Sequence, residues 1–114
     1  MKISFCGREI AISVKKVFWL GKFTGLMFRR NKTPNLLFEF GSEKNIAIHS
    51  VFVFFPFLAI WLNEKNSVLE FKIVKPFTLH IKPEQKFAKL VEVPLSVENR
   101  EIVRLFVDKK ERFK

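Results

Sequence analysis

Residues 57–74 read FLAIWLNEKNSVLEFKIV, and this stretch decides the fold. The apolar run Phe57–Leu62 is followed by the polar segment Asn63–Ser67 and then by a second run, Val68–Val74. Val, Ile and Phe favour strands, whereas Asn and Ser favour turns. The stretch therefore predicts an antiparallel β-hairpin.

Segments of similar length and composition occur on both sides of this hairpin, separated by Gly, Pro and Asn. We expect further strands at Lys2–Phe5, Glu9–Val14, Leu36–Phe40, Asn45–Phe55, Phe77–Ile81 and Phe87–Val93. Short helices are expected at two places, Phe18–Thr24 and Glu98–Leu105. Many strands joined by short turns, without alternating long helices, predict a mainly β fold. We expect a compact small β-barrel or sandwich of antiparallel-rich strands with one or two short helices.

The chain has 114 residues, of which 48% are hydrophobic, enough for one core. We expect a single β-rich domain over residues 1–107. The remaining residues, 108–114, read DKKERFK and are expected to form a charged, frayed C-terminal tail.

Residues 46–62 contain no Lys, Arg, Asp or Glu, which raises the question of a membrane span. His49, Ser50 and Pro56 interrupt this stretch, and its Val, Ile and Phe content is typical of strands. We interpret it as two strands separated by a bend. The single cysteine, Cys6, fits a reducing compartment, so we expect a soluble cytoplasmic protein.

The net charge is +10, from 21 Lys and Arg against 11 acids. Such a balance favours an anionic ligand, an acidic protein or nucleic acid as partner. Arg29, Arg30 and Lys32 form a basic cluster, and Phe rings lie between later lysines. Single-strand binders combine basic grooves with exposed aromatic rings. The three rings concerned, Phe71, Phe77 and Phe87, are equally well explained as core residues.

Standard catalytic and metal-binding motifs are absent from the sequence. Cys6, His49 and His80 are far apart and have no metal-ligand spacing, and no nucleophile elbow or phosphate-binding loop occurs. We therefore expect no cofactor and no metal. The acids within apolar strands are open to two readings: a buried general acid with a raised pKa, or a carboxylate that faces solvent or pairs with Lys. These acids are Glu39, Glu70 and Glu92.

An ordered set of short motifs runs along the chain. Its members are Gly25-Leu26-Met27-Phe28-Arg29, Leu37-Phe38-Glu39-Phe40, Ile48-His49-Ser50, Phe54-Phe55-Pro56, Trp61-Leu62-Asn63, Val74-Lys75-Pro76 and Leu90-Val91-Glu92-Val93-Pro94. In order and spacing this set resembles the family called domain of unknown function 192, in its archaeal-type form. The resemblance implies a compact β-barrel-like or sandwich fold and brings no assigned activity. It also implies an Asp where this chain has Leu58, and an acid at Asn63.

The Gly25–Arg29 motif and the His49–Ser50 pair supply the candidate binding residues Gly25, Met27, Arg29, His49 and Ser50. Arg29 fits either a structural fork to loop carbonyls or Glu39, or an anion clamp. His49 fits either a half-buried structural histidine or a binding or proton-transfer residue.

From these residues we expect a non-enzymatic ligand- or protein-binding accessory domain. One alternative is a small enzyme with acid–base chemistry around His49, paired with Glu39 or Glu92. Another is a nucleic-acid-binding protein that uses its basic surface.

Overall fold

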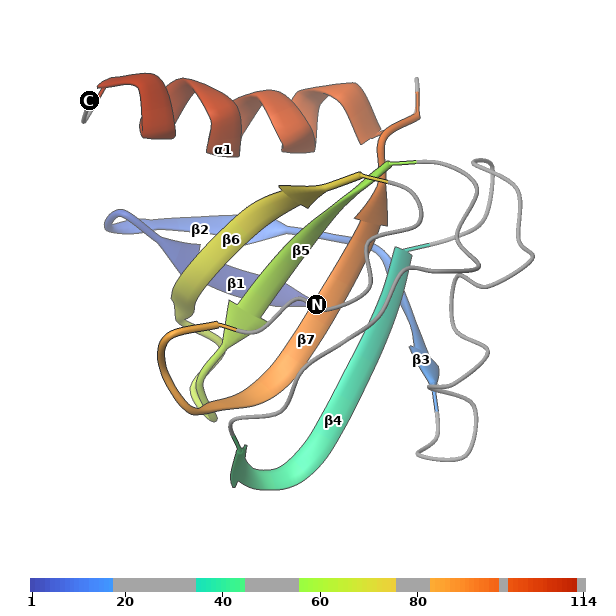
Figure 1. Ribbon diagram of the computed structural model, residues 1–114, viewed down its shortest axis with the longest axis vertical. Helices are drawn as coiled ribbons and strands as arrows, with labels where there is room; N and C mark the ends of the chain where they lie inside the picture. Colours follow the sequence, from blue (N-terminus) through green and yellow to red (C-terminus); the bar gives the residue numbers. More distant parts are fainter. Residues whose placement is uncertain (18–34, 45–55, 76–82, 97–98, 113–114) are drawn as a thin grey trace.

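A five-stranded sheet forms the centre of the structure (Figure 1). The computed structural model describes residues 1–17, 35–44, 56–75, 83–96 and 99–112. Strands lie in the order β3–β4–β7–β5–β6, and every neighbouring pair is antiparallel except β3–β4. Their bounds are β3 Val14–Val17, β4 Asn35–Lys44, β5 Phe57–Leu62, β6 Val68–Val74 and β7 Phe87–Pro94. Among the described strands the sheet remains open.

The N-terminal hairpin pairs β1 (Lys2–Phe5) with β2 (Arg8–Ala11). Both residues of its turn have positive φ, 52° at Cys6 and 77° at Gly7, as a two-residue turn between twisted strands requires. The predicted opening hairpin is thus confirmed. The expected second strand was too long, because Val14 pairs with Asn35 and begins β3 in the other sheet.

The β5–β6 hairpin has the bounds that the sequence predicts. Its turn is built around Asn63, whose side-chain Oδ1 accepts hydrogen bonds from the backbone N–H groups of Lys65 and Ser67, both at 2.9 Å. Asn66 has a φ of 65°, a left-handed conformation that Asn tolerates better than most residues. Local turn chemistry therefore fixes where the two strands start and end.

Two expected elements are longer than predicted. Strand β4 continues through Gly41 and Ser42, with a register shift between Glu39 and Lys44, instead of ending at Phe40. Glycine within a strand marks such irregularities. Helix α1 covers Arg100–Arg112. A frayed tail was expected from residue 108, but residues 108–112 belong to the helix. The Asp-Lys-Lys-Glu-Arg sequence contains good helix formers that extend the helix.

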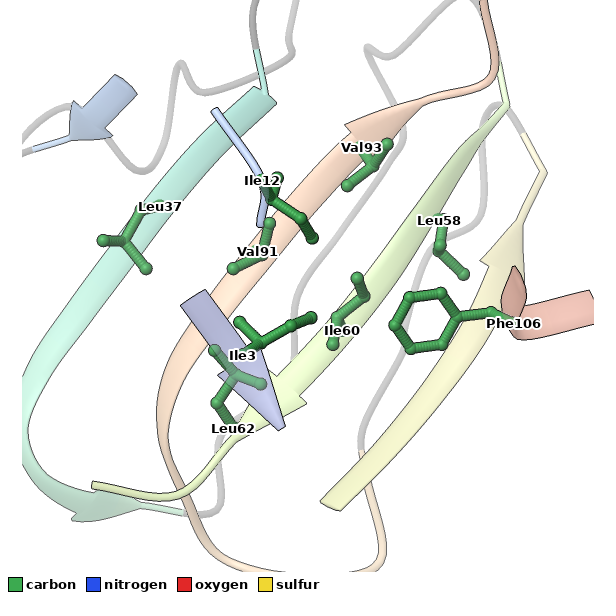
Figure 2. Packing of buried hydrophobic residues seen from close by; sticks show 9 residues of the cluster. All are labelled: Ile3, Ile12, Leu37, Leu58, Ile60, Leu62, Val91, Val93 and Phe106. Atoms are coloured by element: carbon green, nitrogen blue, oxygen red, sulfur yellow. The ribbon is translucent and has the colours of Figure 1, made fainter. Parts of the chain in front are cut away.

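Hydrophobic residues are buried on both faces of the sheet. The hairpin β1–β2 and helix α1 lie on one face, which we call the helix face (Figures 1 and 2). The cluster there comprises Ile3, Ile12, Leu37, Leu58, Ile60, Leu62, Val91, Val93 and Phe106. The opposite face, which we call the Trp61 face, buries Leu36, Phe38, Phe57, Ala59, Trp61, Val74, Phe87 and Leu90. A sheet with apolar layers on both sides is typical of a small β sandwich, as expected.

Three expected elements, Phe18–Thr24, Asn45–Phe55 and Phe77–Ile81, lie outside the described residues. Helix α1 is too short and too charged to cross a membrane, and no other helix occurs in the described part of the chain.

Candidate functional site

The junction between β7 and α1 is held by hydrogen bonds from Asn99, which is buried. Its side-chain Nδ2 donates to the carbonyl of Pro94 at 2.8 Å and to the hydroxyl oxygen of Ser96 at 3.2 Å. Its backbone N–H donates to the carbonyl of Ser96 at 3.1 Å. The start of α1 is therefore fixed relative to the end of β7.

A surface groove of about 410 Å³ lies along α1 beside this junction. It is lined by Leu95, Ser96, Arg100, Val103, Arg104, Val107 and Asp108. The helical members are spaced three and four residues apart, so they share one side of the helix. Val103 and Val107 provide apolar surface, while charged side chains border it. The groove is open to solvent, unlike an enclosed small-molecule pocket.

The two guanidinium groups give the groove a positive end. Within the described part of the chain, neither Arg100 nor Arg104 forms an ion pair; the pairs found there are Lys16–Glu39 at 3.0 Å and Lys72–Glu70 at 3.7 Å. Asp108 lies one turn beyond Arg104, at the other end of the groove. The N-terminal end of a helix dipole adds further positive potential near Arg100.

The second unusual feature is the buried acid Glu92, in the central strand β7. It pairs with Leu36 of β4 on one side and Ala59 of β5 on the other, and Ala59 in turn pairs with Lys72 of β6. These residues form one row across the Trp61 face. Glu92 is 7% exposed, and burial raises its pKa to about 8. Its carboxyl group is therefore largely protonated at neutral pH.

Two further buried polar atoms lie on the same face. The indole Nε1 of Trp61 and Oε2 of Glu70, its cross-strand neighbour, have no hydrogen-bond partner among the described residues. The ammonium of Lys72 lies 3.7 Å from that Glu70 oxygen and 6.0 Å from the centre of the Trp61 ring. Polar groups are thus concentrated around Ala59 in an otherwise apolar layer.

The candidate binding residues from the sequence, Gly25, Met27, Arg29, His49 and Ser50, all lie outside the described residues, as does the Arg29, Arg30 and Lys32 cluster. The strand acids are now distinguished from one another: Glu39 is exposed and paired with Lys16, Glu70 is near Lys72, and Glu92 is buried.

Sequence reasoning missed Arg100 and Arg104. Their four-residue spacing on an amphipathic segment was the available signal.

Of the aromatic rings considered for base stacking, Phe87 is fully buried and Phe71 is partly buried against the core. Phe71 packs edge-to-face against Phe5 and Phe106, and Phe87 packs edge-to-face against Trp61. Phe77 lies outside the described residues. No three His, Cys, Asp or Glu side chains gather as metal ligands in the part of the chain that the structure describes.

No protein-family model matches the chain, and no curated protein matches its sequence. Two solved crystal structures share its fold. One is a "putative transcription regulator" from Sinorhizobium meliloti 1021, with a TM-score of 0.70 and 20% identity over 82% of this chain and 76% of that one. The other is a protein of unknown function from Novosphingobium aromaticivorans DSM 12444, with a TM-score of 0.72 and 12% identity over 87% of this chain and 74% of that one. At these identities the likeness concerns the fold alone.

Proposed function

We propose that this protein is a non-enzymatic binding domain that holds an acidic segment of a protein partner in the groove along α1. The observation that carries the proposal is the pair Arg100 and Arg104, exposed beside an apolar floor without a described carboxylate partner. Arg presents a planar fork of donors that matches a carboxylate in two-point geometry. A net charge of +10 would also draw an acidic partner toward the surface.

The shape of the groove favours a peptide over a small molecule. Small-molecule sites bury most of the ligand's surface, whereas this groove is open along the helix. An extended segment would place an apolar side chain on Val103 and Val107 and an acidic side chain between the two arginines. The hydroxyl of Ser96 adds a donor at that end of the groove.

Nucleic acid is the competing partner, supported by the net charge and by the description of the Sinorhizobium meliloti protein. Asp108 and the apolar floor fit a phosphate backbone less well than they fit an acidic peptide. The acid–base alternative combines His49 with a strand Glu; the buried one, Glu92, lies on the Trp61 face and not in the groove.

Fluorescence anisotropy with three labelled probes tests the proposal: a short peptide of alternating Glu and Leu, the same peptide with Lys for Glu, and single-stranded DNA. Only the acidic peptide is expected to bind at about 200 mM salt. Arg100→Gln and Arg104→Gln should each weaken binding about tenfold, because each removes a charge-assisted hydrogen bond. Lys86→Gln, at an exposed cation outside the groove, should leave binding unchanged.

DNA binding with no acidic-peptide binding would replace this function with nucleic-acid binding. If Lys86→Gln weakened binding of the acidic peptide as much as Arg104→Gln, net charge alone would attract the peptide.

We also propose that the chain is an archaeal-type member of domain of unknown function 192 and that it works in the cytoplasm. In support, the motif segments Leu37–Phe40 and Leu90–Pro94 lie in adjacent strands, β4 and β7, and the one cysteine, Cys6, is a free, exposed thiol. Superposition on an experimental structure of a family member tests the first proposal. Cell fractionation tests the second.

A further inference from the structure

The charged side chains along the groove follow a fixed order. Arg100, Arg104 and Asp108 are spaced four residues apart on α1, and all three are exposed. Residues four apart lie one above the other on the same side of a helix. The groove therefore carries two positive charges toward the start of α1 and a negative charge farther along, with the apolar side chains of Val103 and Val107 beside them.

The carboxylate of Asp108 is available to a bound segment. Among the residues that the structure describes, Asp108 forms no ion pair. Arg104 precedes it by four residues, and a cation placed before an acid in this spacing gives the weaker of the two helical arrangements. Arg104 and Asp108 therefore act on a partner as two separate charges of opposite sign.

The rise of the helix sets the distance between these opposite charges. At about 1.5 Å per residue, Asp108 lies about 6 Å along the helix axis from Arg104 and about 12 Å from Arg100. An extended peptide advances about 3.3 Å per residue and points alternate side chains the same way, so its residues i and i+4 lie about 13 Å apart on one side. An acid at position i would then meet the arginines while a base at position i+4 reaches Asp108. The side chain at i+2 would face Val103 and Val107.

We propose that Asp108 is a specificity-determining residue of the groove, which selects partner segments that carry an acidic, an apolar and a basic side chain at successive alternate positions. This inference rests on the proposed function, because it concerns the same groove and the same kind of peptide. The two arginines alone would accept any acidic segment, whereas Asp108 repels a second acid at its end of the groove and attracts a base there. The preferred segment is therefore acidic at one end and basic at the other.

The charge of the whole protein acts in the opposite sense. A net charge of +10 favours the peptide with more acids, wherever on the surface that peptide binds. At about 200 mM salt the screening length is below about 8 Å, so distant charges contribute little and a charge in contact with the peptide contributes most. A preference for the less acidic peptide at this salt concentration must therefore come from a local acid, and Asp108 is the acid that lines the groove.

Fluorescence anisotropy with three labelled peptides tests this selectivity. The peptides have capped termini and share the pattern Glu-Ala-Leu-Ala followed by Lys, Gln or Glu. At about 200 mM salt we expect the wild-type protein to bind the Lys peptide about threefold more tightly than the Gln peptide. It should bind the Glu peptide about threefold more weakly than the Gln peptide. Effects of this size are typical of single exposed ion pairs and of exposed like charges.

Two variants assign the preference to Asp108. Asp108→Asn removes the charge and should bind the three peptides with nearly equal affinity. Asp108→Lys should reverse the order, so that the Glu peptide binds most tightly. The matched control is Glu101→Gln, because Glu101 is an exposed acid of the same helix that does not line the groove. This control should keep the wild-type order of affinities.

The outcomes separate this inference from the groove function itself. Equal wild-type affinity for the Lys and Gln peptides, with both lost when Arg100 and Arg104 are changed to Gln, would overturn the selectivity and leave the groove function intact. An Asp108→Asn protein with the wild-type order of affinities would also overturn the role of Asp108 alone. If the wild type bound none of the three peptides, both the groove function and its selectivity would be overturned.

Discussion

Phe5, in the N-terminal hairpin, stacks on Phe106 of the C-terminal helix, with ring centroids 4.5 Å apart and planes inclined by 19°. Phe71 of β6 contacts both rings edge-on. The three rings join α1 to β1 and to the sheet. Because α1 forms one wall of the groove, these contacts connect the stability of the core to the proposed binding surface.

Phe106→Ala removes the helix anchor from a fully buried position. We expect the free energy of unfolding to fall by about 3–5 kcal/mol, the usual cost of a Phe-to-Ala change in a core. Acidic-peptide binding should weaken as α1 loosens. Urea unfolding measures the first effect, with Leu105→Ala, at a side chain 39% exposed, as the control. Equal effects of the two substitutions would show that α1 is not anchored through Phe106.

Leu58 lies on the helix face beside Ile60 and Phe106 (Figure 2). Leu58 is fully buried, so a carboxylate here would be desolvated beside the helix anchor. Leu58→Ala is expected to cost about 2–5 kcal/mol, and Leu58→Asp more at pH 7. The difference in unfolding free energy between Leu58→Asp and Leu58→Ala should shrink at pH 4, where the Asp gains a proton. A Leu58→Asp chain as stable as the wild type at pH 7 would contradict this packing.

Glu92 makes stability depend on pH. Its folded-state pKa of about 8 lies above the unfolded value, so between these values the folded chain holds a proton that the unfolded chain has released. Stability is therefore greatest below the unfolded pKa and falls, by up to about 1.4 kcal/mol per pH unit, as pH rises toward 8. Urea unfolding from pH 4 to 9 should show this slope in the wild type and a smaller one in Glu92→Gln. If the unfolding free energies of the wild type and Glu92→Gln changed with pH in parallel, Glu92 would be charged in the folded state.

Asn63 organises the β5–β6 turn through two backbone hydrogen bonds. Asn63→Ala should lower the free energy of unfolding by about 1–3 kcal/mol, because two backbone donors lose their acceptor. Glu64→Ala, at an exposed position of the same turn, should change it by less than about 0.5 kcal/mol. Thermal unfolding of both variants measures the difference. An effect of Glu64→Ala as large as that of Asn63→Ala would remove the special role of the Asn63 side chain.

Local patterns predicted the two hairpins well, because their turns are determined by neighbouring residues such as Gly7 and Asn63. The lengths of β4 and α1 were underestimated for a different reason. Gly41 and Asp108 look like end signals in isolation, yet β7 continues to pair with β4 as far as Lys44, and α1 continues past its last core contact.

The site was harder to predict than the fold. Alternation shows that Glu39, Glu70 and Glu92 lie in strands, but strand order decides which one is buried. Glu92 is buried because β7 is central, with β4 and β5 on its two sides, and sequence gives no strand order. The groove likewise lies where α1 meets the end of β7, and a local sequence pattern does not predict how a helix packs beside a strand end.

The most direct test of the central proposal is to locate the acidic peptide on the folded chain by amide chemical-shift mapping. We expect the shifts to be confined to Leu95, Ser96 and the first two turns of α1, and to disappear when Arg100 and Arg104 are both changed to Gln. Shifts centred instead on the exposed lysines of β3, Lys15 and Lys16, and persisting in that double variant, would contradict the assignment of the groove as the binding site.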